Sequence, residues 1–431
     1  MTVPVAAAKL IDMLRDSRAR TLELVDGLDT EQLFGPRLDI VNPLLWEIGH
    51  LAWFHEYFAL RRLTGGESVL GNADALYNSS AVPHDDRWNL PLPPLAGTLD
   101  YMRRVEEAMI ARLDRERASE EESFLYQLTT FHEDMHDEAF TYTRQTLGYP
   151  APRFAAFKPR ADAGAGPLSG DAEIPGGRFR LGTSPGAAFV FDNEKWAHEV
   201  TVAPFRMARA PVTNAEFAAF VADGGYRQRG FWDDEGWHWR ERANAEHPLY
   251  WRADAGGWMA RRFDRDEKLA PHQPVIHVNW HEANAWCRWA GRRLPTEAEW
   301  EFAASAEPAG NNGLRKRTYP WGDAPPTHAH ANLDGTTLGC TDVAACAAGD
   351  SAFGCRQMIG NVWEWTATTF APYPGFSPDV YEDYSQPWFG SRKVPRGGAW
   401  ATRSRMISNT YRNFFPPDRR DILAGFRTVA L

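Results

Sequence analysis

Two histidines four residues apart are the most chemically informative feature of this sequence. Residues 132–136 read His-Glu-Asp-Met-His and match the H-E-x-x-H pattern of zinc proteases. On a helix, residues four apart lie on one face, so both imidazoles could bind one metal ion. The extended protease pattern would also require Gly at position 139 and His at position 142. The sequence has Ala139 and Tyr142 there, which disfavours a protease.

A third candidate ligand, His50, lies upstream in the apolar segment LLWEIGHLAWF. A lone histidine on such a face is usually a core residue, but a nearby helix with two histidines favours a shared metal site. Three neutral imidazoles from two helices leave open coordination positions, which is typical of catalytic zinc or iron(II). We therefore predict a metal site formed by His50, His132 and His136.

Three polar neighbours of these histidines receive lesser roles. Glu133 and Asp134 project from other faces of the helix, and we interpret them as helix-surface charge. The alternative is a hydrogen bond that supports an imidazole ligand. His55 follows His50 by five residues and points at another angle, so we interpret it as a structural or supporting residue.

Four segments with helical periodicity must position these side chains. Apolar spacing and flanking Pro and Gly residues predict helices at 6–28, 42–63, 98–118 (with Thr98 as N-cap) and 120–149. Four helices with one long connection are typical of a four-helix bundle. We place this bundle at residues 1–150.

The rest of the chain predicts a second domain of mixed structure. Residues 151–172 are rich in Gly, Ala and Pro and indicate an interdomain linker. Residues 173–431 form an α+β region, with strands expected at 173–183, 393–404 and 423–431 and helices at 212–225 and 279–305. The fold class is therefore α+β and multidomain.

Composition limits the classes of partner. The net charge of −10 at pH 7 argues against a broad nucleic-acid footprint. No run of 18 apolar residues predicts a membrane span, and the N-terminus is interpreted as the first helix, not as a signal peptide. The four cysteines include no C-x-x-C pair, so the cytoplasm is the expected location.

Seven motifs, in order, resemble one family over nearly the whole chain. They are LLWEIGHLAWFHEYF, FLYQLTTFHEDMH, RRLPTEAEWEFAA, YPWG, MIGNVWEWT, RGGAWATR and YRNFFPPDRRDILAGFR. Together they resemble the ergothioneine-biosynthesis sulfoxide synthases and their sister group, the selenoneine synthases. The resemblance implies a DinB-like four-helix bundle followed by a formylglycine-generating-enzyme-like domain of the C-type-lectin-like fold.

The resemblance also implies a reaction and its cofactor. The family uses iron(II) and O₂ to join a sulfur or selenium atom to the imidazole C2 of hercynine (N-trimethylhistidine). His50, His132 and His136 match its three iron ligands. True formylglycine-generating enzymes carry a reactive cysteine after the strand that matches residues 396–402. This chain has none there, so sulfatase-activating chemistry is not expected.

Two tyrosines match positions near the family's iron. Tyr381 resembles the catalytic tyrosine that donates a proton, and Tyr384 resembles its partner lining the hercynine pocket. Without the resemblance, the residues favour the interpretation that both are structural aromatics in a Trp- and Tyr-rich domain.

The segment YRNFFPPDRR resembles the family's substrate-binding loop. Asn413 corresponds to an asparagine near the trimethylammonium group, and Phe414 and Phe415 could offer aromatic faces to that cation. Arg419 or Arg420 matches the arginine that binds a donor carboxylate in members that use γ-glutamylcysteine.

At two positions this sequence departs from the family's pattern, and both bear on which sulfur or selenium donor is used. Phe415 stands where γ-glutamylcysteine users carry an aspartate, and Met135 stands where they carry a glutamine. Both changes remove polar recognition and favour a selenosugar donor, with cysteine or γ-glutamylcysteine as the alternative.

Arg87 falls where the bundle of the family contributes further arginine contacts to substrate.

Rival interpretations belong to other classes. A lectin-like binding module fused to a metal-free bundle would not be an enzyme, and a DinB-like zinc enzyme would transfer thiols without O₂.

In the GNVWEW segment, Asn361 and Glu364 are candidates for a structural calcium site, which the sequence leaves unassigned.

Overall fold

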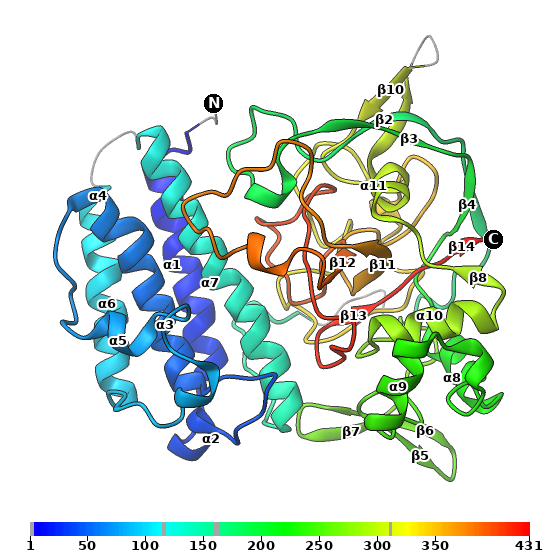
Figure 1. Ribbon diagram of the computed structural model, residues 1–431, viewed down its shortest axis with the longest axis horizontal. Helices are drawn as coiled ribbons and strands as arrows, with labels where there is room; N and C mark the ends of the chain where they lie inside the picture. Colours follow the sequence, from blue (N-terminus) through cyan, green and yellow to red (C-terminus); the bar gives the residue numbers. More distant parts are fainter. Residues whose placement is uncertain (1–3, 114–117, 159–163, 310–312) are drawn as a thin grey trace. The chain divides into compact units, whose positions relative to one another are not determined.

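The computed structural model describes residues 4–113, 118–158, 164–309 and 313–431 (Figure 1). The chain forms two compact units. The first comprises Met1–Ala155, Ser184–Val190 and Pro378–Tyr384, and the second comprises Ala156–Thr183, Phe191–Ser377 and Ser385–Leu431. Residues 114–117 of the expected third helix and 159–163 of the expected linker lie outside the described residues.

The first unit is helical. Its helices are α1 (Ala7–Val25), α2 (Thr30–Phe34), α3 (Leu44–His55), α4 (Arg62–Thr64), α5 (Ala73–Tyr77), α6 (Leu95–Arg112) and α7 (Glu120–Leu147), with a π-helical turn η1 (Glu56–Arg61) and a 3₁₀ turn η2 (His84–Asp86). The long helices α1, α3, α6 and α7 lie side by side and confirm the expected bundle of helices (Figure 1). None of the helices in the described parts of the chain has the length and apolarity required to cross a membrane.

Local signals explain where α7 begins and ends. Ser119 and Glu122 form a capping box at its start, and Gly148 ends it in the left-handed conformation, with φ of 67°. The expected cap of α6 was wrong: the helix begins at Leu95 after Pro94, and Thr98 lies within its first turn. The Thr98 hydroxyl donates to the Pro94 carbonyl, so it does not cap an amide.

A buried polar network joins α1, α3 and α7. Glu133 and Asp134 are both buried, so their interpretation as helix-surface charge is wrong. The Asp134 carboxylate accepts a hydrogen bond from the Ser17 hydroxyl at 2.9 Å.

The Glu133 carboxylate joins the three helices. It accepts hydrogen bonds from Arg18 Nε at 2.8 Å, from Thr21 Oγ1 at 2.7 Å and from His55 Nε2 at 2.8 Å. Because α1 and α3 both pack on α7, the face that carries Glu133 has no access to solvent.

This network predicts a large effect of Arg18 on stability. Replacing Arg18 with methionine leaves the Glu133 carboxylate buried without its counter-charge, so we expect unfolding to become easier by about 3–5 kcal/mol. Urea unfolding followed by circular dichroism measures this change. As a control, Arg103→Met removes two solvent-exposed ion pairs, with Asp100 and Glu107, and should cost at most about 1 kcal/mol. Equal costs for the two substitutions would contradict the prediction.

The second unit combines short strands, helices and long loops. Its strands are β1 (Asp171–Ile174), β2 (Gly177–Leu181), β3 (His198–Val202), β4 (Phe205–Ala208), β5 (Trp251–Asp254), β6 (Gly257–Arg262), β7 (Arg265–Lys268), β8 (Arg292–Arg293), β9 (Ala306–Ala309), β10 (Gly313–Lys316), β11 (Trp363–Thr369), β12 (Lys393–Arg396), β13 (Ala424–Gly425) and β14 (Val429–Ala430). Its α-helices are α8 (Asn214–Ala222), α9 (Asp234–Arg242), α10 (Trp280–Trp289) and α11 (Glu297–Ser305), and its 3₁₀ turns are η3 (Asp192–Glu194), η4 (Arg229–Phe231), η5 (Ala347–Gly349) and η6 (Gln386–Trp388).

The strands of this unit pair over long sequence distances. One sheet has the order β1-β4-β14-β8, and another has the order β12-β11-β13. The remaining sheets are the pairs β2-β3 and β9-β10 and the three-stranded β5-β6-β7. The expected strands at 173–183, 393–404 and 423–431 are confirmed in part by β1, β2, β12, β13 and β14, and the expected helices by α8, α10 and α11.

Helix α11 lies in the core of the second unit. Trp300 and Phe302 of α11 are fully buried and pack in a cluster with Phe179 of β2. Buried ion pairs border this cluster: Arg396 donates to Glu301 at 2.5 Å. Such buried charges are stable only with complete partners, which the sequence supplies from the α11 helix and the β12 strand.

Candidate metal centre

Three histidines converge inside the helical unit: His50 from α3, and His132 and His136 from α7. One ring nitrogen from each lies within 4.8 Å of those from the other two. The ring centroid of His50 lies 5.2 Å from each of the other two, which are 4.5 Å apart. Within the described ranges, this is the one cluster of His, Cys, Asp or Glu arranged to hold a metal ion.

A glycine beside His50 allows a close approach of the chain. A Cβ atom at Gly49 would lie 2.2 Å from the ring of Tyr77, so only glycine leaves room for that ring. The Tyr77 carbonyl is thereby placed 2.8 Å from His50 Nδ1. A carbonyl can only accept, so His50 Nδ1 carries the proton and Nε2 keeps its lone pair.

His136 and His132 differ in their support. His136 Nδ1 lies 2.5 Å from Glu47 Oε1, on α3, and donates to this carboxylate. His132 Nδ1 is buried without a hydrogen-bond partner, and its ring stacks on Phe54 with centroids 3.5 Å apart. The Nε2 atoms of His50 and His136 are therefore the ones oriented to bind a metal.

The protonation states also fit a metal site. Burial and electrostatic repulsion between the imidazoles of His50 and His136 lower the pKa of His50 to about 3. Burial and the other histidines also lower the pKa of His132 well below its usual value. Both imidazoles are neutral at pH 7, so their lone pairs are available to a cation without loss of a proton. A cluster of three imidazole ligands fits zinc or iron(II).

Aromatic side chains enclose the cluster. Trp46 stacks on His50 with centroids 5.0 Å apart and an interplanar angle of 10°, and Trp53 stacks on it at 5.6 Å. With Phe54 on His132, these rings restrict rotation of the imidazoles and lower the local dielectric.

A short segment from the C-terminal half of the chain belongs to the helical unit. Residues Pro378–Tyr384 include both tyrosines expected near the metal. The ring of Tyr381 lies 5.0 Å from Phe54 and 6.0 Å from His132, in edge-on contacts. Burial and the charge of Asp383 raise the pKa of Tyr381 to about 12. The half-buried phenol is therefore protonated at neutral pH.

Tyr384 and Met135 contact one another. The Tyr384 hydroxyl donates to the Met135 sulfur at 3.7 Å, and its ring lies 5.9 Å from Tyr381. The structure thus brings Met135, Tyr384 and Tyr381 into one chain of contacts, in which the ring of Tyr381 also contacts His132. The predicted roles of these residues in substrate binding remain predictions.

Arg87 has several protein partners. Its guanidinium donates to Asn42 Oδ1 at 2.7 Å and to the carbonyls of Ser79 and Val82. It also lies 4.0 Å over the ring of Trp46, which stacks on His50. These contacts fix Arg87 beside the metal cluster, and a carboxylate ligand would have to compete with three oxygens.

The aromatic substrate-loop residues lie in the second unit. Asn413 Oδ1 accepts a hydrogen bond from the amide of Phe414 at 2.8 Å. The ring of Phe414 stacks on Phe370 at 4.2 Å. Phe415 forms paired backbone hydrogen bonds with Lys393, which hold the loop next to β12.

The two arginines of this loop are already paired with carboxylates. Arg419 donates two hydrogen bonds of 2.6 Å to Asp421. Arg420 donates to the buried Glu282 at 3.2 Å. A donor carboxylate would therefore have to displace, or add to, an existing ion pair.

The candidate calcium site is not supported. The Asn361 side chain is occupied by Asn332, Gln357 and the backbone of Thr341. The Glu364 carboxylate accepts from Trp300 and Arg427. Neither side chain directs a spare oxygen toward a shared position.

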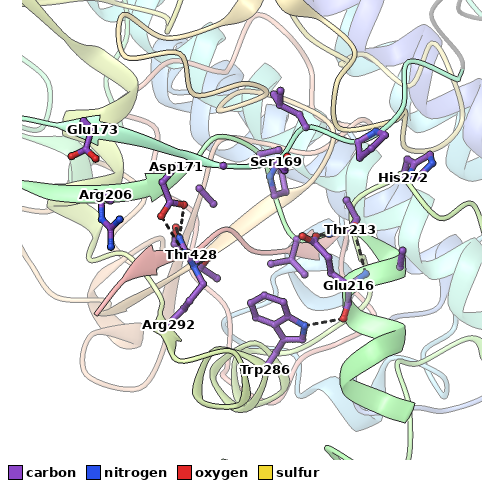
Figure 2. Close-up of a pocket in the computed structure, with 18 residues that line it drawn as sticks. Ser169, Asp171, Glu173, Arg206, Thr213, Glu216, His272, Trp286, Arg292 and Thr428 are labelled. Atoms are coloured by element: carbon purple, nitrogen blue, oxygen red, sulfur yellow. Dashed lines mark hydrogen bonds and ion pairs between the residues drawn. The ribbon is translucent and has the colours of Figure 1, made fainter. Parts of the chain in front are cut away.

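A cavity of about 600 Å³ lies within the second unit (Figure 2). Two of its charged side chains pair with one another, since Arg292 donates to Asp171 at 2.8 Å. The Glu216 carboxylate accepts a hydrogen bond from the backbone amide of Thr213. None of the predicted metal or substrate residues lines it. We assign it no role in the chemistry.

Sequence reasoning missed two supports of the metal cluster, Glu47 and Tyr77. Glu47 precedes His50 by three residues and therefore shares its helix face, so an E-x-x-H spacing was available as a signal. The Tyr77 contact is made by its backbone carbonyl, which every residue type has, so the sequence could not predict this contact.

Comparison with known proteins supplies the family context. The DinB superfamily matches residues 13–140, and the sulfatase-modifying factor enzyme 1-like domain matches residues 159–430. These matches confirm the expected fold class: an α+β, multidomain chain with a helical DinB-like part followed by a C-type-lectin-like domain.

Three relatives are similar to this chain. Hercynine oxygenase of Mycolicibacterium thermoresistibile is 40% identical over 435 residues, which cover 97% of this chain and 94% of the relative. Hercynine oxygenase of Mycobacterium tuberculosis is 39% identical over 418 residues, or 96% of each chain. Formylglycine-generating enzyme of Streptomyces coelicolor is 34% identical over 309 residues, which cover 63% of this chain and 95% of the relative.

Proposed function

This chain belongs to the hercynine oxygenase family and is an oxidoreductase, and from that premise we propose that it joins a chalcogen atom to C2 of the hercynine imidazole. Because the chain is an oxidoreductase, the alternative of a lectin-like binding module without catalysis is rejected. The observation that carries the proposal is the cluster of His50, His132 and His136. Iron(II) held there would supply the activation of O₂ and would template both substrates, with hercynine beside the metal.

The overall reaction balances without an external reductant. The imidazole C2–H bond and the Se–H bond of a selenol, or the S–H bond of a thiol, are broken, and a C–Se or C–S bond forms. The two substrates give up four electrons to O₂. One oxygen atom ends on the chalcogen as a selenoxide or sulfoxide, and the other leaves as water with the two protons.

Tyr381 is proposed as the proton donor in this reaction. Its phenol is protonated at neutral pH because burial and Asp383 raise its pKa to about 12. Its ring contacts Phe54 and His132 edge-on, so the side chain is held beside a proposed ligand. A phenol in this position can deliver a proton without water entering an aromatic-lined site.

Hercynine recognition is assigned to aromatic and amide groups. A quaternary ammonium accepts no hydrogen bond and is attracted to aromatic faces. We infer that Tyr384, Asn413 and Phe414 contact the hercynine molecule, with Asn413 and Phe414 nearest its trimethylammonium group.

For the second substrate we infer a selenosugar. Phe415 and Met135 offer no charge to a donor's amino-acid head. Arg419 and Arg420, which follow Phe415 in the same loop, are paired with Asp421 and Glu282, which reduces their attraction for a donor carboxylate. Cysteine or γ-glutamylcysteine, with C–S bond formation, is the alternative.

Competition between donors tests the proposal. The iron-loaded enzyme is given hercynine, O₂ and equal concentrations of a selenosugar, cysteine and γ-glutamylcysteine, and products are weighed by mass spectrometry. We expect the carbon–selenium product to dominate. Conversion of γ-glutamylcysteine alone would overturn the assignment of the donor.

A substitution at Phe415 sharpens this test. Phe415→Asp places a carboxylate where a donor ammonium would bind, so we expect the share of γ-glutamylcysteine product to rise. Phe415→Leu keeps the position apolar and should leave the product ratio unchanged. Equal product ratios in the two variants would contradict a role for Phe415 in donor choice.

A further inference from the structure

Glu47 is a buried carboxylate that contacts one proposed ligand. It is 2% exposed and lies on α3, one helical turn before His50. Its Oε1 atom accepts a hydrogen bond of 2.5 Å from Nδ1 of His136, which lies on α7. One helix therefore supplies both a ligand and the acceptor that orients the ligand of another helix.

The three histidines have unequal partners. His50 donates to the neutral carbonyl of Tyr77, and His132 Nδ1 has no hydrogen-bond partner. His136 alone of the three donates to a carboxylate in these contacts. The carboxylate of Glu133, next to His132 in sequence, is instead held by Arg18 and His55.

The Glu47 carboxylate makes its hydrogen bond to His136. Arg87 lies close enough for its charge to interact with that of Glu47, but its hydrogen bonds go to Asn42 and to two backbone carbonyls. A carboxylate partner fixes the tautomer and orientation of an imidazole and raises its basicity as a ligand. In a site enclosed by aromatic rings, this charge acts through a low dielectric.

We propose that Glu47 is a positioning residue that holds His136 as an Nε2 ligand and adds negative charge to the metal centre. It would strengthen binding of iron(II) and lower the Fe(III)/Fe(II) reduction potential. This inference rests on the proposed function, because that function identifies the metal as iron.

Metal binding and reduction potential test the inference without turnover. Protein is titrated anaerobically with iron(II) against a chelator, and the potential is measured by spectroelectrochemistry. In Glu47→Gln, which keeps the size but loses the charge, we expect affinity for iron(II) to fall by about 10- to 100-fold and the potential to rise. Unchanged affinity and potential would overturn the inference.

Two further variants separate charge from folding. Glu47→Asp keeps the charge on a shorter side chain, so its affinity and potential should fall between those of the wild type and Glu47→Gln. Glu56→Gln changes another buried carboxylate, which accepts from Ser68 and Tyr101 and contacts none of the three histidines. It should leave iron binding unchanged, and an equal loss of affinity in it would overturn the role of Glu47.

The outcomes distinguish this inference from the proposed function. Iron binding that depends on Glu47, with no product from hercynine, would reject the proposed function and retain the inference. Product formation by the wild type, together with unchanged iron binding in Glu47→Gln, would retain the proposed function and reject the inference about Glu47. A wild-type protein that binds no iron would overturn both.

Discussion

Replacing His50 with alanine is expected to remove iron from the protein and to abolish oxygen-dependent product formation. The variant keeps only His132 and His136, two imidazoles from one helix. Two neutral ligands from a single helix cannot enclose the metal from both sides of the cluster. Metal analysis of anaerobically purified protein should give about one iron per wild-type chain and essentially none for the variant.

His55→Gln is the control for this experiment. His55 lies on the same helix as His50, but its Nε2 atom bonds to Glu133 and not to the cluster. Glutamine can still donate a hydrogen bond to that carboxylate, so the variant should fold and retain its iron. A His50→Ala protein that keeps full iron occupancy and wild-type turnover would contradict the proposed ligand set.

Sequence spacing was informative where the chemistry depends on local geometry. His132 and His136 share a helix face because they are four residues apart, whatever packs against the helix. His50 could be added because the same predicted bundle contained a helix with two histidines on one face, which favoured a shared metal site over a core histidine. The structure brings these three residues together in one cluster.

Burial was harder to predict because it depends on contacts between helices. Glu133 follows His132 directly, and its helix position alone is compatible with a solvent-exposed charge. Its burial results from the packing of α1 and α3, which supply Arg18 and His55 as partners. Arg18 and His55 are each more than 70 residues from Glu133 in sequence, so no pattern within the H-E-x-x-H segment could predict them as its partners.

Local sequence patterns also could not predict which distant segments of the chain pair or pack together. Residues 173–183 were correctly expected to contain two strands, but β1 pairs with β4 and β2 pairs with β3. Likewise, Pro378–Tyr384 belongs to the helical unit although its neighbours in sequence belong to the second unit. Only the family resemblance, which compares whole chains, pointed to Tyr381 as a partner of the histidines.

Phenylalanine at position 381 is expected to slow product formation by about 10²- to 10⁴-fold, the usual contribution of a positioned proton donor. The substitution removes only the hydroxyl, so the edge-on ring contacts with Phe54 and His132 can persist. Iron content should therefore equal that of the wild type. Steady-state rates with hercynine and the preferred donor, measured on protein of known iron content, give the size of the effect.

Tyr384→Phe separates this role from a general need for phenols in the segment. It removes the hydroxyl that donates to Met135 and leaves Tyr381 in place. Because that hydroxyl contacts a thioether, a weak acceptor, its loss should cost far less than the loss of the Tyr381 hydroxyl. If both variants lose activity equally, or if Tyr381→Phe retains the wild-type rate, Tyr381 is not the proton donor. A selective loss in Tyr381→Phe with full iron content would instead assign the proton to that phenol, since the ligands and the aromatic enclosure are the same in both variants.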